Sequence, residues 1–485
     1  MTARKHMQLA GRTRRARISA FRSARGVGTK PTLLALLAIA ALQAALATPA
    51  AAAGPEVERA KLANGLRLVM STQRSVPIVA INCLVDGGAR VDPPGKAGLA
   101  SLTGSLLSEG TKGRTSEEIS RLIDSLGGSF GTGGSSDWIS ASAAVLSRDF
   151  ETGLDLVARS LREPTFPPEE VERRRKETLG ELEADEDQPG VVAQRAFRKT
   201  LYGDAPYGHP VDGTPETVAK LTREDVVEFH RNQITPARTI CAIVGDVATS
   251  EMKAVAEKLL GSWTGSGEGY DPKPAEAPPA TSVVVDRPVT QANIVIGQIG
   301  VARSNPDYFS ILLMNHVLGG GGFTSRLMQT VRTKGGLAYS VSSHFEGNKL
   351  PGPFQVALQT KVESAAEAIK LVRDEIAKLH AEGATEAELE AAKDYLTGSF
   401  PLRLDSIGKL AGFLVQVEYF GLGDDYIERY PERVRAVTLE DVRAAAKKYL
   451  HPNDLVQVVV GPAAQLAEQG IVGTAAHARP ATKQD

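Results

Sequence analysis

Residues 438–442, Thr-Leu-Glu-Asp-Val, repeat residues 222–226, Thr-Arg-Glu-Asp-Val, at an offset of 216. The landmarks around these blocks keep this offset or one of 218: Pro236 and Pro452, Gly245 and Gly461, Glu170 and Glu388, Gly180 and Gly398. Solenoids repeat shorter units more often, so two long blocks in the same order indicate one duplicated domain.

Each copy mixes strand and helix patterns without strict alternation. Apolar runs such as Ile78–Val85 and Thr239–Gly245 predict strands, and Thr115 and Thr222, each followed three residues later by an acid, predict capped helix starts. Asn64-Gly65 predicts the turn of a hairpin, and residues 127–134 predict a glycine-rich turn region. Strands and helices in this order favour an α+β fold. We therefore expect two homologous domains, each an antiparallel-rich sheet covered by helices, with the helices of a domain on one face of its sheet.

Residues 265–281, GSGEGYDPKPAEAPPAT, are rich in proline, glycine and alanine, which is typical of a linker. The linker divides the chain into an N-terminal domain over residues 54–264 and a C-terminal domain over residues 282–465. Residues 466–485 are expected to form a flexible tail.

Residues 1–53 have the features of a secretory signal peptide. Nine basic and no acidic residues lie within residues 1–55, residues 31–47 are apolar except for Thr32 and Gln43, and small residues follow up to Ala53. The rival is an uncleaved membrane anchor, for which the apolar run is short. We expect an exported protein, periplasmic or secreted, with no stable membrane span after cleavage.

The charge and the cysteines restrict the function classes. Because the whole chain carries a net charge of −1, the residues after the basic N-terminus are acidic overall, and a nucleic-acid surface is not expected. Cys83 and Cys241, the two cysteines, both lie in apolar strand patterns, so buried free thiols are the default interpretation. A disulfide between them is the alternative in an oxidising compartment.

Residues 319–343, GGGGFTSRLMQTVRTKGGLAYSVSS, contain the most distinctive polar pair. Four glycines should end a helix, a short helix is expected over residues 323–331, and a strand over residues 337–343. Arg332 and Tyr339 offer several hydrogen-bond donors and no strong base, which suits holding carbonyls or an oxyanion. The structural alternative is that Arg332 favourably ends a helix and Tyr339 packs at a strand edge.

Other familiar catalytic patterns are missing from the sequence. The chain has no His-Glu-x-x-His, and no lysine follows the glycine run to make a phosphate-binding loop. The acidic run around residues 177–187 follows a basic segment and predicts a solvated helix face. His316 precedes the glycines, where the helix dipole favours a histidine.

At Gly98–Thr111, GLASLTGSLLSEGT, the chain resembles the pitrilysin/insulinase family of zinc metallopeptidases. In that family an inverted zinc motif, His-x-x-Glu-His, occupies this block. Here the first ligand position is Ser101, the general-base position is Gly104 and the second ligand position is Ser105. The third ligand of the family falls on Glu181, and one carboxylate cannot hold zinc where three ligands are needed. The resemblance covers residues 57–461 and implies the fold of one half of a clamshell.

The second half keeps the family pattern at Gly319, Gly320, Gly321 and Gly322, followed by Ser-Arg-Leu and by Arg332 and Tyr339. In the family this Arg/Tyr pair resembles a clamp on the substrate backbone, and some members divide zinc and clamp between two chains. The resemblance thus implies a non-zinc-binding subunit of a secreted heterodimeric zinc endopeptidase, with no metal of its own. Its partner would carry His-x-x-Glu-His and the zinc, and its substrate would be a peptide or an unfolded polypeptide. The alternatives are a catalytically inactive peptide-binding or assembly protein and, less favoured, a self-sufficient peptidase.

Overall fold

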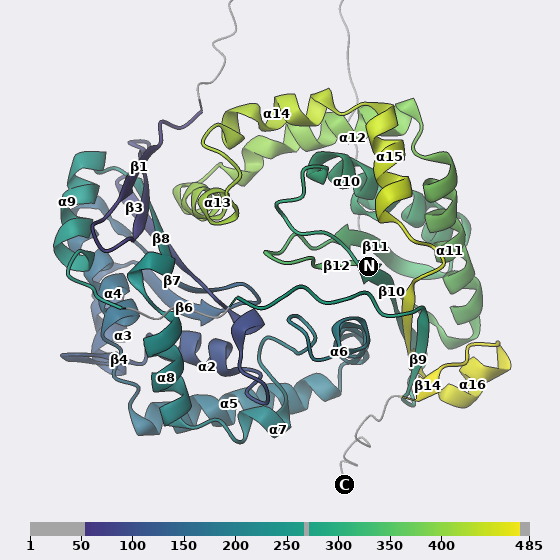
Figure 1. Cartoon of the computed structure of the whole chain (residues 1–485), viewed down its shortest axis with the longest axis horizontal. Coiled ribbons are helices and arrows are strands. Elements are labelled where there is room, and N and C mark those ends of the chain that lie inside the picture. The colour runs from purple at the N-terminus through teal and green to yellow at the C-terminus, as the bar shows by residue number, and fades with distance from the viewer. Residues whose placement is uncertain (1–53, 266–270, 476–485) are drawn as a thin grey trace, which may run out of the picture. The chain divides into compact units, whose positions relative to one another are not determined.

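A computed structural model describes residues 54–265 and 271–475 of the chain (Figure 1). The predicted signal peptide lies outside these residues, as does part of the predicted linker. Within the predicted linker, residue 265 and residues 271–280 lie in neither helix nor strand, whereas Thr281 is already the first residue of a strand. Of the helices within these ranges, none has the length and apolar character that crossing a membrane requires.

The first sheet has six strands in the order β1-β2-β8-β3-β7-β6. The Asn64-Gly65 hairpin joins β1 to β2, and β2 runs parallel to β8, while the other pairs are antiparallel. The strands are β1 (Glu58–Lys61), β2 (Arg67–Thr72), β3 (Ile78–Asp86), β6 (Ser129–Gly134), β7 (Trp138–Leu146) and β8 (Thr239–Gly245). The helices of this half are α2 (Leu99–Leu106), α3 (Ser116–Leu126), α4 (Phe150–Arg162), α5 (Pro168–Glu186), α6 (Pro189–Tyr202), α7 (Pro215–Val218), α8 (Arg223–Gln233) and α9 (Thr249–Leu260), with the small hairpin β4 (Gly110–Thr111) and β5 (Arg114–Thr115).

The second sheet also has six strands, in the order β11-β12-β10-β13-β9-β14. They are β9 (Thr281–Asp286), β10 (Gln291–Ile299), β11 (Ala338–Phe345), β12 (Pro353–Lys361), β13 (Val456–Gly461) and β14 (Thr474–Ala475). The α-helices of this half are α10 (Tyr308–Asn315), α11 (Ala365–Glu382), α12 (Glu386–Ser399), α13 (Ile407–Phe420), α14 (Tyr426–Ala436), α15 (Leu439–Tyr449) and α16 (Ala463–Glu468). The α+β fold with two antiparallel-rich sheets is confirmed. The first sheet adds one parallel pair, β2 with β8, and the second adds two, β9 with β13 and β9 with β14.

The duplication extends to the register of the sheets. Gly245 ends β8 opposite Thr72 of the parallel strand β2, and Gly461 ends β13 opposite Asp286 of the parallel strand β9. The predicted capping boxes are also present in both halves, at Thr222 before α8 and at Thr438 before α15. Local sequence signals therefore place equivalent elements at equivalent positions of both sheets.

Two helices are exchanged between the halves. α6 of the first half packs on β10 and β13, and α13, which lies 218 residues later in the chain, packs on β3 and β8 (Figure 1). Alternate residues of β3 show this arrangement, because Ile81 belongs to the core of its own half while Ala80 shares a core with Leu414 of α13. The expectation of helices on one face of each sheet was therefore incomplete, since the second face receives a helix from the other half.

Buried polar contacts reinforce this exchange. The Tyr419 hydroxyl of α13 donates hydrogen bonds to Asp86 Oδ1 at 2.8 Å and to the Asp137 carbonyl at 3.0 Å. Burial alone would raise the pKa of Asp86, but the charge of Arg90, together with hydrogen bonds from Lys349 and Tyr419, keeps that pKa below its ordinary value. The two halves are thus held together by charged hydrogen bonds as well as by apolar packing.

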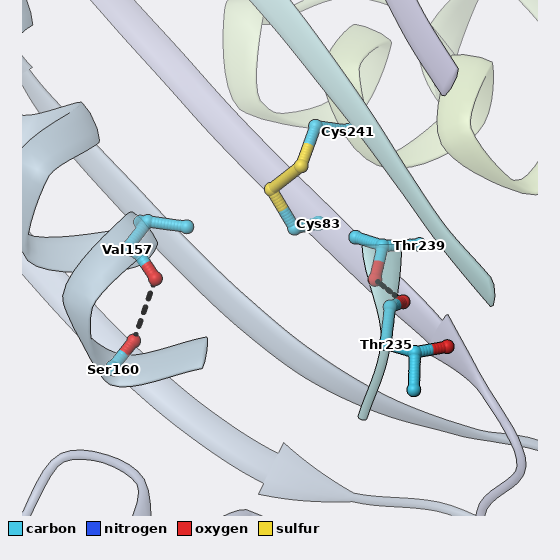
Figure 2. The surroundings of a disulfide bond; sticks show 6 residues. All are labelled: Cys83, Val157, Ser160, Thr235, Thr239 and Cys241. Carbon is cyan, nitrogen blue, oxygen red and sulfur yellow. Dashed lines mark hydrogen bonds between the residues drawn. A yellow bond between two sulfur atoms is a disulfide. The ribbon is translucent and has the colours of Figure 1, made fainter. Parts of the chain in front are cut away.

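Cys83 of β3 and Cys241 of β8 are register partners and form a disulfide, with their Cα atoms 4.0 Å apart (Figure 2). Both side chains are fully buried in the core that also contains Val157 of α4. The default interpretation as free thiols was therefore wrong, because neighbouring strands place the two side chains on the same face of the sheet. The second sheet has no disulfide at the equivalent register position, because Ile296 faces Gln457 there.

Two further expectations need correction. Residues 127–134, predicted as a glycine-rich turn region, contain the edge strand β6, whose glycines allow close contact with a helix. Residues 466–475, predicted as the start of a flexible tail, are structured: Leu466 of α16 and Ile471 are buried in the second core, and β14 pairs with β9. The apolar side chains explain this second difference, since they gain stability by leaving water.

Candidate functional site

The residues at the family's zinc positions make structural hydrogen bonds. Ser101, Gly104 and Ser105 all lie on α2. Ser101 Oγ donates to Asp212 Oδ1 at 2.7 Å, and Ser105 Oγ donates to the Leu102 carbonyl of its own helix at 2.9 Å. Both hydroxyls therefore contribute to the packing and local bonding of α2.

The general-base position is closed by backbone contact. A Cβ added at Gly104 would lie 2.6 Å from the carbonyl carbon of Gly133 and 2.7 Å from the nitrogen of Gly134, both on β6. From the other side, a Cβ at Gly134 would lie 2.7 Å from Cα of Ser101. Real Cβ atoms do not approach backbone so closely, so a glutamate at residue 104 would require α2 and β6 to separate.

The remaining zinc position, Glu181, is exposed on α5. Within residues 54–265 and 271–475, no three His, Cys, Asp or Glu side chains lie close enough together to hold a metal ion. Zinc bound at a catalytic site normally has three protein ligands. The donor set of the first half therefore does not fit the zinc that its family binds.

The second region surrounds the glycine run. α10 ends at Asn315 and continues as a π-helical turn over His316–Gly320, so the helix ends at the glycines as predicted. Gly319 is buried against β11, where a Cβ would lie 2.5 Å from the nitrogen of Ser343. The Asn315 side chain donates to the Ser343 carbonyl at 3.1 Å and accepts from Ser343 Oγ at 2.8 Å. Gly319 thus holds the turn against the strand, whereas Gly320 and Gly322 are exposed.

Arg332 and Tyr339 are both presented by irregular backbone. Arg332 lies on a π-helix over Met328–Lys334, which replaces the helix expected over residues 323–331. Tyr339 lies in β11 where the pairing with β12 shifts between Ala338 and Val341, a β-bulge that leaves consecutive side chains exposed. π-helices and bulges are frequent at functional sites because they redirect side chains. Tyr339 is 84% exposed, so it does not pack at the strand edge.

The structure brings Arg332 and Tyr339 together and adds a residue that sequence reasoning missed. The Arg332 guanidinium lies 4.9 Å from the ring centre of Tyr339 and 4.8 Å from that of Phe323, both arrangements being cation–π contacts. No carboxylate in the described part of the chain lies within ion-pair distance of Arg332. Its N–H groups are therefore available to an acceptor from another molecule. In the sequence, the one indication that Phe323 belongs to this site is its position directly after the four glycines.

Neighbouring residues fix the backbone of this region. Arg326, next to Ser325, donates from Nε and Nη2 to the two carboxylate oxygens of Glu388, both at 2.7 Å, and from Nη2 to the Gly383 carbonyl at 3.0 Å. Burial would raise the pKa of Glu388, but hydrogen bonds from Arg326 and Thr385 lower it to about 2. A two-pronged pair of this kind is stronger and more directional than a simple ion pair, so Arg326 anchors the segment to α12.

Comparison with known proteins identifies the family. The sequence model described as "Insulinase (Peptidase family M16)" matches residues 67–215, and that described as "Peptidase M16 inactive domain" matches residues 220–396. An uncharacterized zinc protease of Streptomyces coelicolor is 30% identical over 416 residues, covering 84% of this chain and 90% of that protein. An uncharacterized zinc protease of Bacillus subtilis is 25% identical over 84% of this chain and 99% of its own length.

Solved structures agree with the sequence matches. The crystal structure of a peptidase M16 inactive domain from Pseudomonas fluorescens has a TM-score of 0.80 and 31% identity, and covers 84% of this chain and 98% of its own. A protease from Helicobacter pylori shares the fold, with a TM-score of 0.78 and 22% identity over 84% of this chain and all of its own. The two homologous domains are those of a clamshell half. The chain belongs to the insulinase family, peptidase family M16, and has Ser101, Gly104 and Ser105 at the positions of the family's zinc motif.

Proposed function

We propose that this chain is the non-zinc-binding subunit of a heterodimeric zinc endopeptidase. The observation that carries the proposal is the contrast between its two signature regions. α2 has lost both the zinc ligands and the space for the general base. In the second region Tyr339 is exposed, Arg332 is half-buried, and the two side chains lie together with no acidic partner for Arg332 among the described residues.

The chemistry available to the pair is donation of hydrogen bonds. Arg332 provides N–H groups on a planar, permanently charged guanidinium, and Tyr339 provides a hydroxyl. Neither is a base or nucleophile near neutral pH, so the pair cannot cleave a peptide bond by itself. Such donors accelerate a reaction when they are aimed at the oxygen that becomes negative in the transition state. In this proposal the partner, which carries His-x-x-Glu-His, supplies zinc and the activated water.

The proposed substrate is a peptide or an unfolded polypeptide, and the proposed location is outside the cytoplasm. Two features support export: the basic, then apolar, then small-residue order of residues 1–53, and the Cys83–Cys241 disulfide. Disulfides persist in oxidising compartments and are rare in the cytosol.

The decisive experiment uses the full chain purified together with its zinc-bearing partner. We expect zinc on the partner only, and hydrolysis of an unstructured peptide by the pair. Arg332→Ala should lower kcat by roughly 10²–10³-fold, the range found for loss of one oxyanion donor, without weakening the pairing. Lys334→Ala is a matched control, since Lys334 is an exposed cation on the same π-helix with no ion pair of its own among the described residues. Unchanged hydrolysis by Arg332→Ala would contradict the proposal.

A second candidate function is a catalytically inactive peptide-binding or assembly protein. The closed contact between α2 and β6 favours it, because a chain that only binds needs no space for a base. This candidate predicts peptide binding or complex formation without hydrolysis in any reconstituted pair, and an Arg332→Ala variant that loses peptide affinity.

A further inference from the structure

The clamp residues do not account for all the exposed aromatic surface of the second half. Tyr395 of α12 is 61% exposed, which is unusual for a large aromatic side chain, and is comparable with Phe323 at 66%. Exposed apolar groups of this size that gather in one place commonly mark a binding site. Tyr395 therefore needs an explanation beyond the Arg332 clamp.

Tyr395 is held in place by His316. The two rings stack with their centres 5.0 Å apart and their planes inclined by 33°. His316 is buried at the end of α10, and burial lowers the pKa of its imidazole, which keeps the ring neutral. A neutral imidazole packs as an aromatic plate, so one face of Tyr395 is fixed while much of the ring stays open to solvent.

The glycine run connects this ring pair with the clamp. A Cβ on Gly321 would lie 3.0 Å from His316 Nε2, so the glycine backbone lies directly against the histidine. Two residues later the chain reaches Phe323, whose ring lies beneath the Arg332 guanidinium. Gly320 and Gly322 are exposed and carry no side chains, and a Cβ on Gly322 would meet nothing within 4 Å. A second polypeptide backbone can therefore approach closely between the two aromatic positions.

We propose that the Tyr395–His316 pair is a side-chain subsite that selects an apolar or aromatic residue of an extended peptide whose backbone crosses the glycine run toward Arg332. The inference rests on the proposed function in one respect, namely that Arg332 contacts the same peptide. It makes Tyr395 a specificity-determining residue, with the apolar side chain packing on the free face of its ring.

The size of the surface favours a peptide over a folded partner. Stable protein–protein interfaces bury about 800 Å² on each side through roughly 20–30 residues, whereas the aromatic surface here consists of Phe323, Tyr339 and Tyr395 around a glycine floor. In an extended peptide, backbone carbonyls alternate with side chains. A carbonyl can accept a hydrogen bond from Arg332 while a side chain packs on the aromatic surface.

The test measures binding of labelled, unstructured alanine–serine peptides to the full chain alone, so that it does not depend on hydrolysis. One series carries a single phenylalanine at successive positions, and the reference peptide carries none. We expect phenylalanine at one or two positions to tighten binding roughly tenfold. Tyr395→Ala should abolish this gain, and Tyr395→Phe should retain it. Val472→Ala is the matched control, because Val472 is 67% exposed next to β14, at the opposite edge of the sheet from β11.

Four results would overturn the inference: no binding by the wild-type chain, an equal loss for both peptides in Tyr395→Ala, retention of the phenylalanine gain in Tyr395→Ala, or weaker pairing with the zinc-bearing subunit at unchanged peptide affinity. The last would assign Tyr395 to a subunit interface. The outcome is separable from that of the proposed function, since a selective effect of Tyr395→Ala combined with normal hydrolysis by Arg332→Ala would leave the subsite in place and remove only the clamp.

Discussion

In the first half of the chain, Gly104 and Gly134 bring the backbones of α2 and β6 into direct contact, whereas in the second half Gly322 is exposed and a Cβ added there would meet nothing within 4 Å. Glycine thus has opposite effects at the two signature regions. One half has lost its reactive side chains and has filled the space that they would need. The other has kept its donors, a half-buried Arg332 on a π-helix and an exposed Tyr339 at a β-bulge.

The first signature region is therefore closed by its backbone, whereas the second remains open to a ligand. A site that had lost only its ligands could be restored by replacing side chains, but the α2–β6 contact also involves the backbone. In the second half, by contrast, the neighbouring Arg326–Glu388 pair and the Asn315–Ser343 pair are complete. The variants below test whether the first region is closed and rigid while the second is open.

The largest expected effect on the free energy of unfolding comes from removing the Cys83–Cys241 disulfide, which is present in the first sheet and has no equivalent in the second. Replacing Cys83 and Cys241 by serine removes a cross-link that closes a loop of 158 residues, and should lower the free energy of unfolding by about 4–5 kcal/mol on the chain-entropy account. Chemical denaturation of the single and double variants measures this. The two single variants should each cost nearly as much as the double, whereas additive effects would show that no bond is present. Alkylation before reduction should find no free thiol in the wild-type chain.

The next effect tests the closed contact itself. Gly134→Ala should cost about 2–3 kcal/mol of unfolding free energy, because its Cβ would lie 2.7 Å from the α2 backbone. Gly133→Ala, one residue away on the same strand, meets nothing within 4 Å, so it should be neutral or stabilise by up to about 1 kcal/mol. The denaturation midpoint should therefore fall for Gly134→Ala and stay unchanged or rise for Gly133→Ala, and equal shifts would show that α2 and β6 are not in contact.

Sequence reasoning predicted the elements whose signals are local. The hairpin at Asn64-Gly65 and the capping boxes at Thr115 and Thr222 lie where they were expected, because turns and caps depend on neighbouring residues. The repeat partner of Thr222, Thr438, also makes a capping box. The duplication was visible because both halves keep the same landmarks at nearly constant offsets.

The features that sequence reasoning missed depend on distant contacts. α6 and α13 bury surface against the sheet of the other half, so nothing in their own half indicates where they pack. Strand β6 looked like a turn region because its glycines are required by α2, which lies about thirty residues earlier in the chain. Family resemblance singled out Arg332 and Tyr339, and the structure places their side chains together. The exposure of Tyr339 and the contact of Phe323 with Arg332 depend on a π-helix and a β-bulge, which no local sequence pattern indicated.

A smaller effect on the free energy of unfolding, and one that depends on pH, is expected from the Arg326–Glu388 pair, which holds the segment around Arg332 against α12. The pKa of Glu388 is lowered in the folded chain to about 2 from its ordinary 4.5, so its ionised form stabilises the fold above pH 4.5, and this stabilisation is lost as pH falls from about 4.5 to about 2. Glu388→Gln should cost about 1–2 kcal/mol at pH 7 and much less near pH 2. Glu118→Gln is the control, since Glu118 caps α3 in the same way without an arginine partner. A cost that does not change with pH would show that the Arg326 pair is not formed.

The smallest effect on stability is expected where the functional effect should be largest. Tyr339 is 84% exposed and contacts Arg332 only through an exposed cation–π arrangement, which contributes about 0.5–1 kcal/mol. Tyr339→Ala should therefore change the free energy of unfolding by no more than that amount, while it removes a donor on which hydrolysis by the proposed pair depends. A loss of several kcal/mol would mean that Tyr339 supports the fold, and the contrast between a closed first region and an open second region would then fail at its most exposed residue. A small change in stability together with a large loss of turnover would instead show that this residue is retained for a ligand, since its removal leaves the rest of the molecule almost undisturbed.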